Sequence, residues 1–343
     1  MLILWGIISG VFWVNIYYRQ IQDDHIWLSS TPEEQGIDSE IVEQIIRSIK
    51  QQNIAIDSLL IIRYGYLVIE EYLNLEEYLS LTQSNQDNMH SLYSTTKSFT
   101  SALIGIAIDK GYINSTSLKV VDFFPDYTIE NLDARKKNMT LHHLLTMTSG
   151  FEWTGDNAYE MLSSENSVNY MLNLPMKYNP GIKLEYITGV THILSAIIQK
   201  TTGTTTLEFA RKYLFNPLGI STVQWTYDRQ NINHGDHGLS LTSRDMAKFG
   251  YLYLKNGTWN EKRIISTDWI IKSIQTYNLF EEYSGYGYQW WTFPQLNVYY
   301  TKGYHGQSIY VAPEKDLVVV FTANLSNDLI IDDYFLSIFS AIN

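Results

Sequence analysis

Strand-forming segments at both ends of the chain, separated by a long helical stretch, most constrain its fold. Residues 59–72 have the pattern of a hairpin with its turn at Gly65. Three apolar runs near the C-terminus also have strand character: 297–304, 308–312 and 317–322. Between these groups, residues 89–257 carry mainly helical periodicity. The pattern predicts an α/β (α+β) fold, with one antiparallel sheet built from both termini and a second, mainly helical lobe.

Two helical segments flank these strands. Residues 39–51 precede the hairpin, and residues 327–342 follow the last strand with apolar periodicity. We expect both helices to cover the sheet. Residues 20–38 are polar and are predicted to be a linker, so that residues 39–343 form the folded domain.

The first 19 residues differ from the rest of the chain. Residues 2–18 are mostly apolar, and Arg19 follows them. A stretch of about 17 apolar residues is the lower limit for a membrane-spanning helix. The segment therefore predicts a membrane anchor or signal-anchor, with the folded domain outside the cytoplasm. A cleaved signal peptide, giving a secreted protein, and a buried helix are the alternatives.

The composition excludes several classes of function. The 343 residues carry a formal net charge of −12 and no basic block, which argues against a nucleic-acid partner. The absence of cysteine excludes thiol nucleophiles and thiolate metal sites. Close histidine pairs occur only at 142–143 and 234–237, outside any familiar zinc motif. No glycine-rich phosphate-binding loop occurs, so we expect neither a metal nor a cofactor.

Ser94 and Lys97 form the most informative local pattern. They begin a helix whose apolar residues recur at the spacing of one buried face: Phe99, Ala102, Leu103, Ile106 and Ala107. Serine and lysine three positions apart share one side of a helix. A serine nucleophile needs a nearby amine for its proton and donors for the resulting oxyanion, which a helix N-terminus supplies. The alternative is a capping serine followed by a surface lysine.

Tyr186 is a second candidate, on a loop that follows a Pro-Gly turn and precedes a strongly apolar helix. A tyrosine can transfer a proton if a neighbouring cation lowers its pKa from about 10. We expect Lys97 to be that cation. A tyrosine used only for packing is the alternative.

Gly303 and Tyr304 form a third candidate, near the end of a predicted edge strand. A glycine there lets a substrate approach the backbone closely. The N–H groups of Tyr304 and Ser94 would then form an oxyanion hole. A hairpin with a glycine turn is the compatible alternative.

These three motifs, in this order, resemble the serine β-lactamase and penicillin-recognising superfamily. The similarity is greatest to its class C-like branch of esterases, D-aminopeptidases and aminohexanoate-oligomer hydrolases. It runs from about Trp27 to the C-terminus, and three further segments support it: 141–150, 238–250 and 287–291. The resemblance implies a β-lactamase/transpeptidase-like fold. It also implies Ser94 as the acylated nucleophile, Lys97 as its proton acceptor and Tyr186 as general base and acid.

Two positions depart from the β-lactamase pattern and indicate a different substrate. Thr188 stands where β-lactamases commonly have asparagine, and Thr301 stands at the lysine position of the usual Lys-Thr-Gly. Lys302 is expected to face the opposite side of the strand. We expect Thr188, Thr301, Gly303 and His305 to contact the substrate, with His305 supplying part of the missing charge.

The sequence therefore predicts a serine hydrolase that cleaves amide or ester bonds through an acyl-enzyme on Ser94. Its substrate is expected to be a small molecule or a short oligomer. The alternative is a sensor or binding module of the same fold that acylates without turnover. A stoichiometric burst without steady-state release would indicate the sensor.

Overall fold

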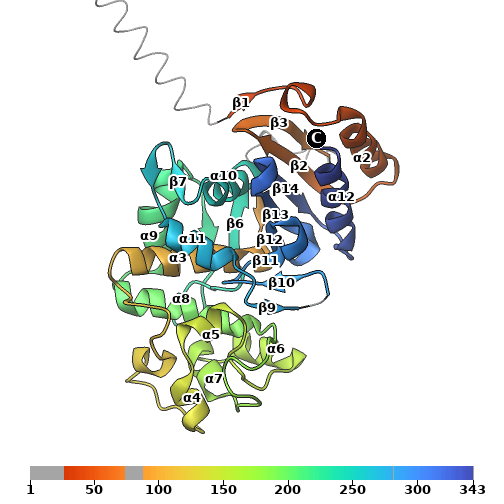
Figure 1. The fold of residues 1–343 in the computed structure, drawn as a ribbon. Helices are drawn as coiled ribbons and strands as arrows, with labels where there is room; N and C mark the ends of the chain where they lie inside the picture. The colour runs from red at the N-terminus through yellow and green to blue at the C-terminus, as the bar shows by residue number, and fades with distance from the viewer. Residues whose placement is uncertain (1–26, 74–87, 281, 343) are drawn as a thin grey trace, which may run out of the picture.

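The computed structural model describes residues 27–73, 88–280 and 282–342. Its centre is a nine-stranded sheet that both ends of the chain build (Figure 1). In spatial order the strands are β1 (Leu28–Ser29), β3 (Tyr66–Tyr72), β2 (Ile56–Arg63), β14 (Leu317–Ala323), β13 (Gln307–Ala312), β12 (Val298–Gly303), β11 (Trp291–Phe293), β10 (Gly285–Tyr286) and β9 (Asn278–Leu279). All neighbours are antiparallel except β1 and β3. The predicted fold class is confirmed.

Within the sheet, β2 from the N-terminal part of the chain pairs with β14 from the C-terminal part. Every residue of β14 is buried, and β2 is buried throughout except for Asp57. Strands that are covered on both faces have continuous apolar runs, as 59–62 and 317–321 do. Both strands therefore lie in the interior of the sheet, as expected for a sheet formed by strands from both ends of the chain.

Helices cover both faces of the sheet. On one face lie α2 (Ser39–Gln51) and α12 (Leu329–Ser340), whose apolar residues share a core with alternate residues of the strands. On the other face lies α10 (Ser243–Leu254), followed by α3 (Thr96–Asp109) and α11 (Thr267–Ile274). A Cβ on Gly250 would lie 2.7 Å from side-chain carbons of Ile309 and Val318. The glycine therefore lets α10 approach the sheet closely.

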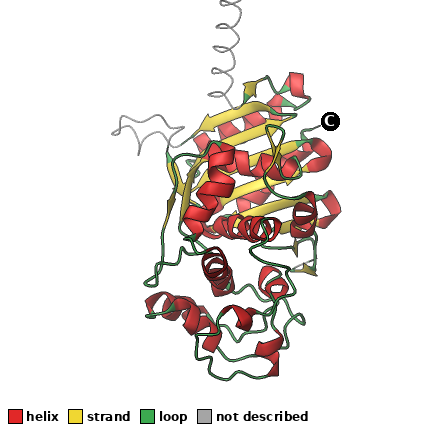
Figure 2. Cartoon of the chain, turned by 90° about the vertical axis from the view of Figure 1, so that its left-hand side faces the viewer, coloured by secondary structure: helices red, strands yellow, loops and turns green. Residues whose placement is uncertain are grey.

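The second lobe is mainly helical, as predicted, and lies below the sheet in Figure 2. Its helices are α4 (Ala134–Asn138), α5 (Leu141–Leu145), α6 (Gly155–Ser163), α7 (Ser167–Asn173), α8 (Thr188–Thr202) and α9 (Thr206–Ala210). The sequence did not predict two small sheets. One has three strands, β4 (Met89–Ser91), β6 (Leu239–Thr242) and β5 (Gln224–Trp225), and the other is the hairpin of β7 (Thr258–Trp259) and β8 (Lys262–Arg263). These strands have two to four residues each, too few for a visible period.

The N-terminal part requires two corrections. Residues 27–38, expected within a linker, contribute β1 to the sheet, and Trp27 packs edge-on against Tyr251 and Trp259. The expected membrane-anchored location is also corrected. Among the residues that the structure describes, no helix combines the length and apolar content needed to cross a bilayer. The segment 1–19 that suggested an anchor lies outside the described residues.

Candidate active site

Ser94 and Lys97 meet at the N-terminal end of α3. Ser94 lies in the short 3₁₀ helix η3 (Tyr93–Thr95) that leads into α3. Nζ of Lys97 donates to Ser94 Oγ at 2.9 Å and to the carbonyl oxygen of Asp236 at 3.1 Å. Lys97 is only 1% exposed. A surface lysine is therefore excluded, and the serine and amine have the spacing of a nucleophile and its base.

The backbone around Ser94 is held rigidly. Tyr93 has a φ of 46°, a region that a residue with a bulky side chain adopts rarely. From Thr96 to Ala107, α3 is buried at every residue. At Gly105 a Cβ would fall within 2.4–2.5 Å of the ring of Trp269, so α11 lies directly against α3. This packing fixes the position of the serine at the mouth of the helix.

Tyr186 lies beside Lys97. The nitrogen of Lys97 is 5.1 Å from the centre of the Tyr186 ring, within range of a cation–π interaction. The ring stacks on Trp291 with centroids 5.6 Å apart and meets Tyr286 edge-on at 6.0 Å. Thr188 follows two residues later as the first residue of α8 and is partly exposed. One end of the sheet thus supplies an aromatic wall behind the tyrosine.

Gly303 ends β12 directly against the loop that precedes Ser94. A Cβ at this position would lie 2.4 Å from the carbonyl oxygen of Leu92, so only glycine fits without movement. The next residue, Tyr304, is 60% exposed, and its ring meets that of Tyr93 edge-on at 5.8 Å. The end of β12 and the start of η3 are therefore adjacent, as the predicted oxyanion hole requires.

The remaining predicted substrate-binding residues have different surroundings. Thr301 is 1% exposed, and its hydroxyl bonds Thr95 Oγ1 at 3.1 Å and the N–H of Ile309 at 3.0 Å. Its side chain is thus buried and joins β12 to η3 and β13. His305 has a φ of 66°, and its Nδ1 lies 2.8 Å from the carbonyl oxygen of Leu325.

Lys302 lies on the other side of β12 and pairs with Asp332 at 3.0 Å, which confirms its predicted direction. Lys302 therefore does not take the place of the lysine that the usual Lys-Thr-Gly motif has at position 301.

Two residues at the site were not predicted. Asp236, in the segment between β5 and β6, accepts from Lys97 through its backbone, a role that no side-chain motif reveals. Gln289 is buried at a φ of 63°, and its side-chain amide nitrogen donates to the carbonyl oxygens of Leu144 and Leu145. The backbone carbonyl oxygen of Gln289 accepts a hydrogen bond from Ser98 Oγ on α3 at 2.6 Å. Gln289 therefore joins α3 to the helical lobe, and the only signal was its place in the segment 287–291.

A group of ionisable residues surrounds Asp236. Burial alone would raise the pKa of Asp236, but His237 and Lys97 hold that pKa well below its usual range. Burial, with smaller contributions from His237 and His192, lowers the pKa of His234 to about 4. Among the described residues, one set of three could hold a metal ion: His192, His234 and Asp236, with candidate ligand atoms within 4.8 Å of one another.

Known proteins share both this sequence pattern and this fold. The 6-aminohexanoate-dimer hydrolase of Paenarthrobacter ureafaciens is 23% identical over 290 residues, which cover 77% of this chain and 71% of that protein. A Bacillus anthracis structure described as a candidate 6-aminohexanoate-dimer hydrolase superposes with a TM-score of 0.75 at 19% identity, covering 92% of this chain and 86% of the other. A family VIII carboxylesterase gives a TM-score of 0.70 at 14% identity, covering 92% and 98%.

These likenesses confirm the resemblance inferred from the motifs. At such identities the solved structures establish the fold, and the family assignment depends on a match over nearly the whole described chain. The family model named Beta-lactamase matches residues 42–334, which include Ser94, Lys97, Tyr186 and Gly303. The protein therefore belongs to the Beta-lactamase family of the serine β-lactamase and penicillin-binding superfamily.

Proposed function

We propose that the protein is a serine hydrolase that cleaves amide or ester bonds of small molecules or short oligomers through an acyl-enzyme on Ser94. The observation that carries the proposal is the 2.9 Å contact between Lys97 Nζ and Ser94 Oγ, made by a lysine that is almost fully buried. Hydrolase relatives and the family assignment support the general class.

In the proposed acylation step, Lys97 in its neutral form accepts the hydroxyl proton as Ser94 Oγ attacks the substrate carbonyl carbon. The N–H groups of Ser94 and Tyr304 stabilise the oxyanion that forms. Tyr186 delivers a proton to the leaving alcohol or amine as the bond to the carbonyl carbon breaks. A water then attacks the ester carbonyl, and Tyr186 takes its proton back from that water. Lys97 returns its proton to Ser94 Oγ as the ester bond breaks, which releases the carboxylic acid and restores both residues.

The surroundings of the site favour substrates without an essential carboxylate. Thr301 leaves no cation at the usual lysine position, and Lys302 is paired with Asp332 on the far face of β12. The wall next to the nucleophile is aromatic instead, formed by Tyr186 and Trp291. Apolar acyl groups gain from burial against such rings. Esters and amides with aliphatic chains therefore suit the site better than β-lactam carboxylates.

The test is pre-steady-state and steady-state hydrolysis of p-nitrophenyl butyrate, with the 6-aminohexanoate dimer and nitrocefin as further substrates. We expect sustained turnover of the ester and a large loss in Ser94→Ala. Ser91→Ala, an exposed serine three residues earlier, is the matched control. A fluorophosphonate should label the wild type at Ser94 and not the Ser94→Ala variant. A stoichiometric burst without turnover would indicate a sensor, and turnover unchanged in Ser94→Ala would refute the proposal.

A further inference from the structure

Three buried side-chain atoms with no hydrogen-bond partner belong to a cluster that includes Asp236, whose backbone carbonyl accepts from Lys97. They are Nδ1 of His192, Nδ1 of His234 and Oδ1 of Asp236, and none of them makes a hydrogen bond. The three residues are 0%, 8% and 3% exposed. A polar atom that is buried without a partner is unfavourable, so three of them in one place indicate a missing occupant.

The three residues come from two separate parts of the chain, and the fold brings their side chains close together. His192 lies on α8, while His234 and Asp236 lie in the segment between β5 and β6. Candidate ligand atoms of the three lie within 4.8 Å of one another. We infer that His192, His234 and Asp236 form a binding site for a divalent transition-metal ion such as Zn²⁺ or Co²⁺. The argument for this site does not rest on the proposed hydrolase activity.

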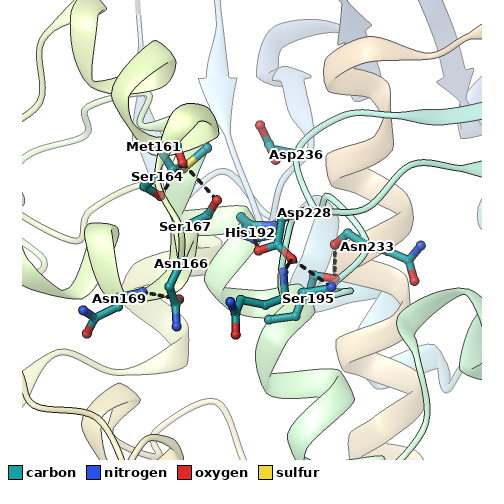
Figure 3. Close-up of polar contacts among 12 residues, drawn as sticks. Met161, Ser164, Asn166, Ser167, Asn169, His192, Ser195, Asp228, Asn233 and Asp236 are labelled. Atoms are coloured by element: carbon teal, nitrogen blue, oxygen red, sulfur yellow. Dashed lines mark hydrogen bonds and ion pairs between the residues drawn. The ribbon is translucent and has the colours of Figure 1, made fainter.

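Two of the candidate ligands are oriented by a second contact, as metal ligands commonly are. His192 Nε2 lies 2.9 Å from Asp228 Oδ2, and this contact leaves its Nδ1 for a metal (Figure 3). Asp236 Oδ2 lies 2.9 Å from His237 Nδ1, which leaves Oδ1. The ring of His237 also stacks on His234 with centroids 4.3 Å apart. Each ring or carboxylate is therefore held with a free donor atom.

The donor chemistry of the three residues suits a transition-metal ion. Such ions are bound by neutral imidazoles and ionised carboxylates. Two imidazoles and one carboxylate are a donor set for Zn²⁺ and related ions, with a fourth position left for water.

The distances allow closure around an ion with small side-chain movements. Metal–nitrogen bonds of about 2.0–2.1 Å in a tetrahedron place ligand atoms roughly 3.4 Å apart. The separation of up to 4.8 Å thus has to shorten by no more than about 1.4 Å. Binding would join α8 to the segment whose Asp236 carbonyl accepts from Lys97, so the ion would fix one acceptor of that amine. The competing occupant is a single buried water.

The test is metal binding by the chelator-treated full-length protein. We expect about one equivalent of Zn²⁺ per chain by equilibrium dialysis, and a tetrahedral visible spectrum with Co²⁺. We also expect a thermal midpoint that rises with Zn²⁺ concentration. Removal of a ligand in His192→Asn or Asp236→Asn should weaken binding by more than about 100-fold, and Asp228→Asn should weaken it by roughly 10–100-fold.

His143→Asn is the control, because this half-buried histidine bonds Thr140 and is not among the three candidate ligands. It should bind metal as the wild type does. Circular dichroism checks that each variant folds. If a ligand variant does not fold, the wild-type Co²⁺ spectrum decides. No binding, a six-coordinate spectrum, or equal losses in His143→Asn and the ligand variants would overturn the inference and leave a buried water as the occupant.

Discussion

Replacing Gly303 with alanine tests the contact on which the proposed oxyanion hole depends. The added Cβ would lie 2.4 Å from the Leu92 carbonyl oxygen, whereas ordinary contacts begin at 3.4 Å. The end of β12 and the loop before Ser94 must therefore separate by about 1 Å. A displacement of that size at a reacting centre lowers catalysis by roughly 100-fold. The strain itself should lower the free energy of unfolding by about 1–3 kcal/mol.

The assay pairs kcat/KM for p-nitrophenyl butyrate with urea unfolding. Gly155→Ala is the control, because a Cβ there meets nothing within 4 Å, and it should match the wild type in both measurements. A Gly303→Ala variant that is less stable but keeps kcat/KM within about twofold would show that the Tyr304 N–H does not serve the reaction. A variant unchanged in both would refute the reasoning from the close contact itself.

Three further outcomes follow from the contacts already described and from an ion pair beside β3. Ser94→Ala and Lys97→Ala should each lower kcat/KM by about 1,000-fold or more, and the double variant should be little worse; multiplicative losses would contradict their joint action. Arg244 holds Glu70 through two contacts of 2.6 Å, so Arg244→Ala should lower the free energy of unfolding by about 1–3 kcal/mol near pH 7. Burial opposes the ionisation of Glu70, but Arg244 keeps its pKa below 4.5; this stabilisation is present above pH 4.5 and lost as the pH falls through the lower, folded-state pKa. Urea unfolding should therefore show the difference between wild type and variant shrinking in acid, and a constant difference would contradict this. Gly105→Ala would place a Cβ 2.4 Å from an indole ring and should lower the melting temperature, whereas an unchanged melting temperature would show that α11 moves freely.

The parts of the fold that could be predicted are those with a long, regular apolar pattern. The helix predicted over 39–51 has the same bounds as α2, and the predicted C-terminal strands match β12, β13 and β14 to within one or two residues. The short strands β4, β5 and β6 were missed because two to four residues show no period. The tight packing of α3 likewise depends on neighbours that only the folded chain brings together.

The site was predictable where side chains carry the chemistry and not where the backbone does. The spacing of Ser94 and Lys97 along one helix was sufficient to place them together. The carbonyl of Asp236 has no residue signature, and the burial of Thr301 depends on its contact with Thr95 in η3, which only the folded chain brings close. The grouping of His192 with His234 and Asp236 joins residues that are far apart in the sequence, so no local motif could reveal it.

The pairing of β2 with β14 has a consequence for how this protein is made. Ser58 and Thr322 bond one another although 264 positions separate them in the chain. During synthesis, the apolar strand β2 leaves the ribosome long before its central partner exists, and such non-local pairing also makes folding slow. Until the last strand arrives, β2 exposes an edge that can pair with another chain. A protein truncated before β14 should therefore aggregate rather than fold, and chaperones should bind the nascent chain during this interval.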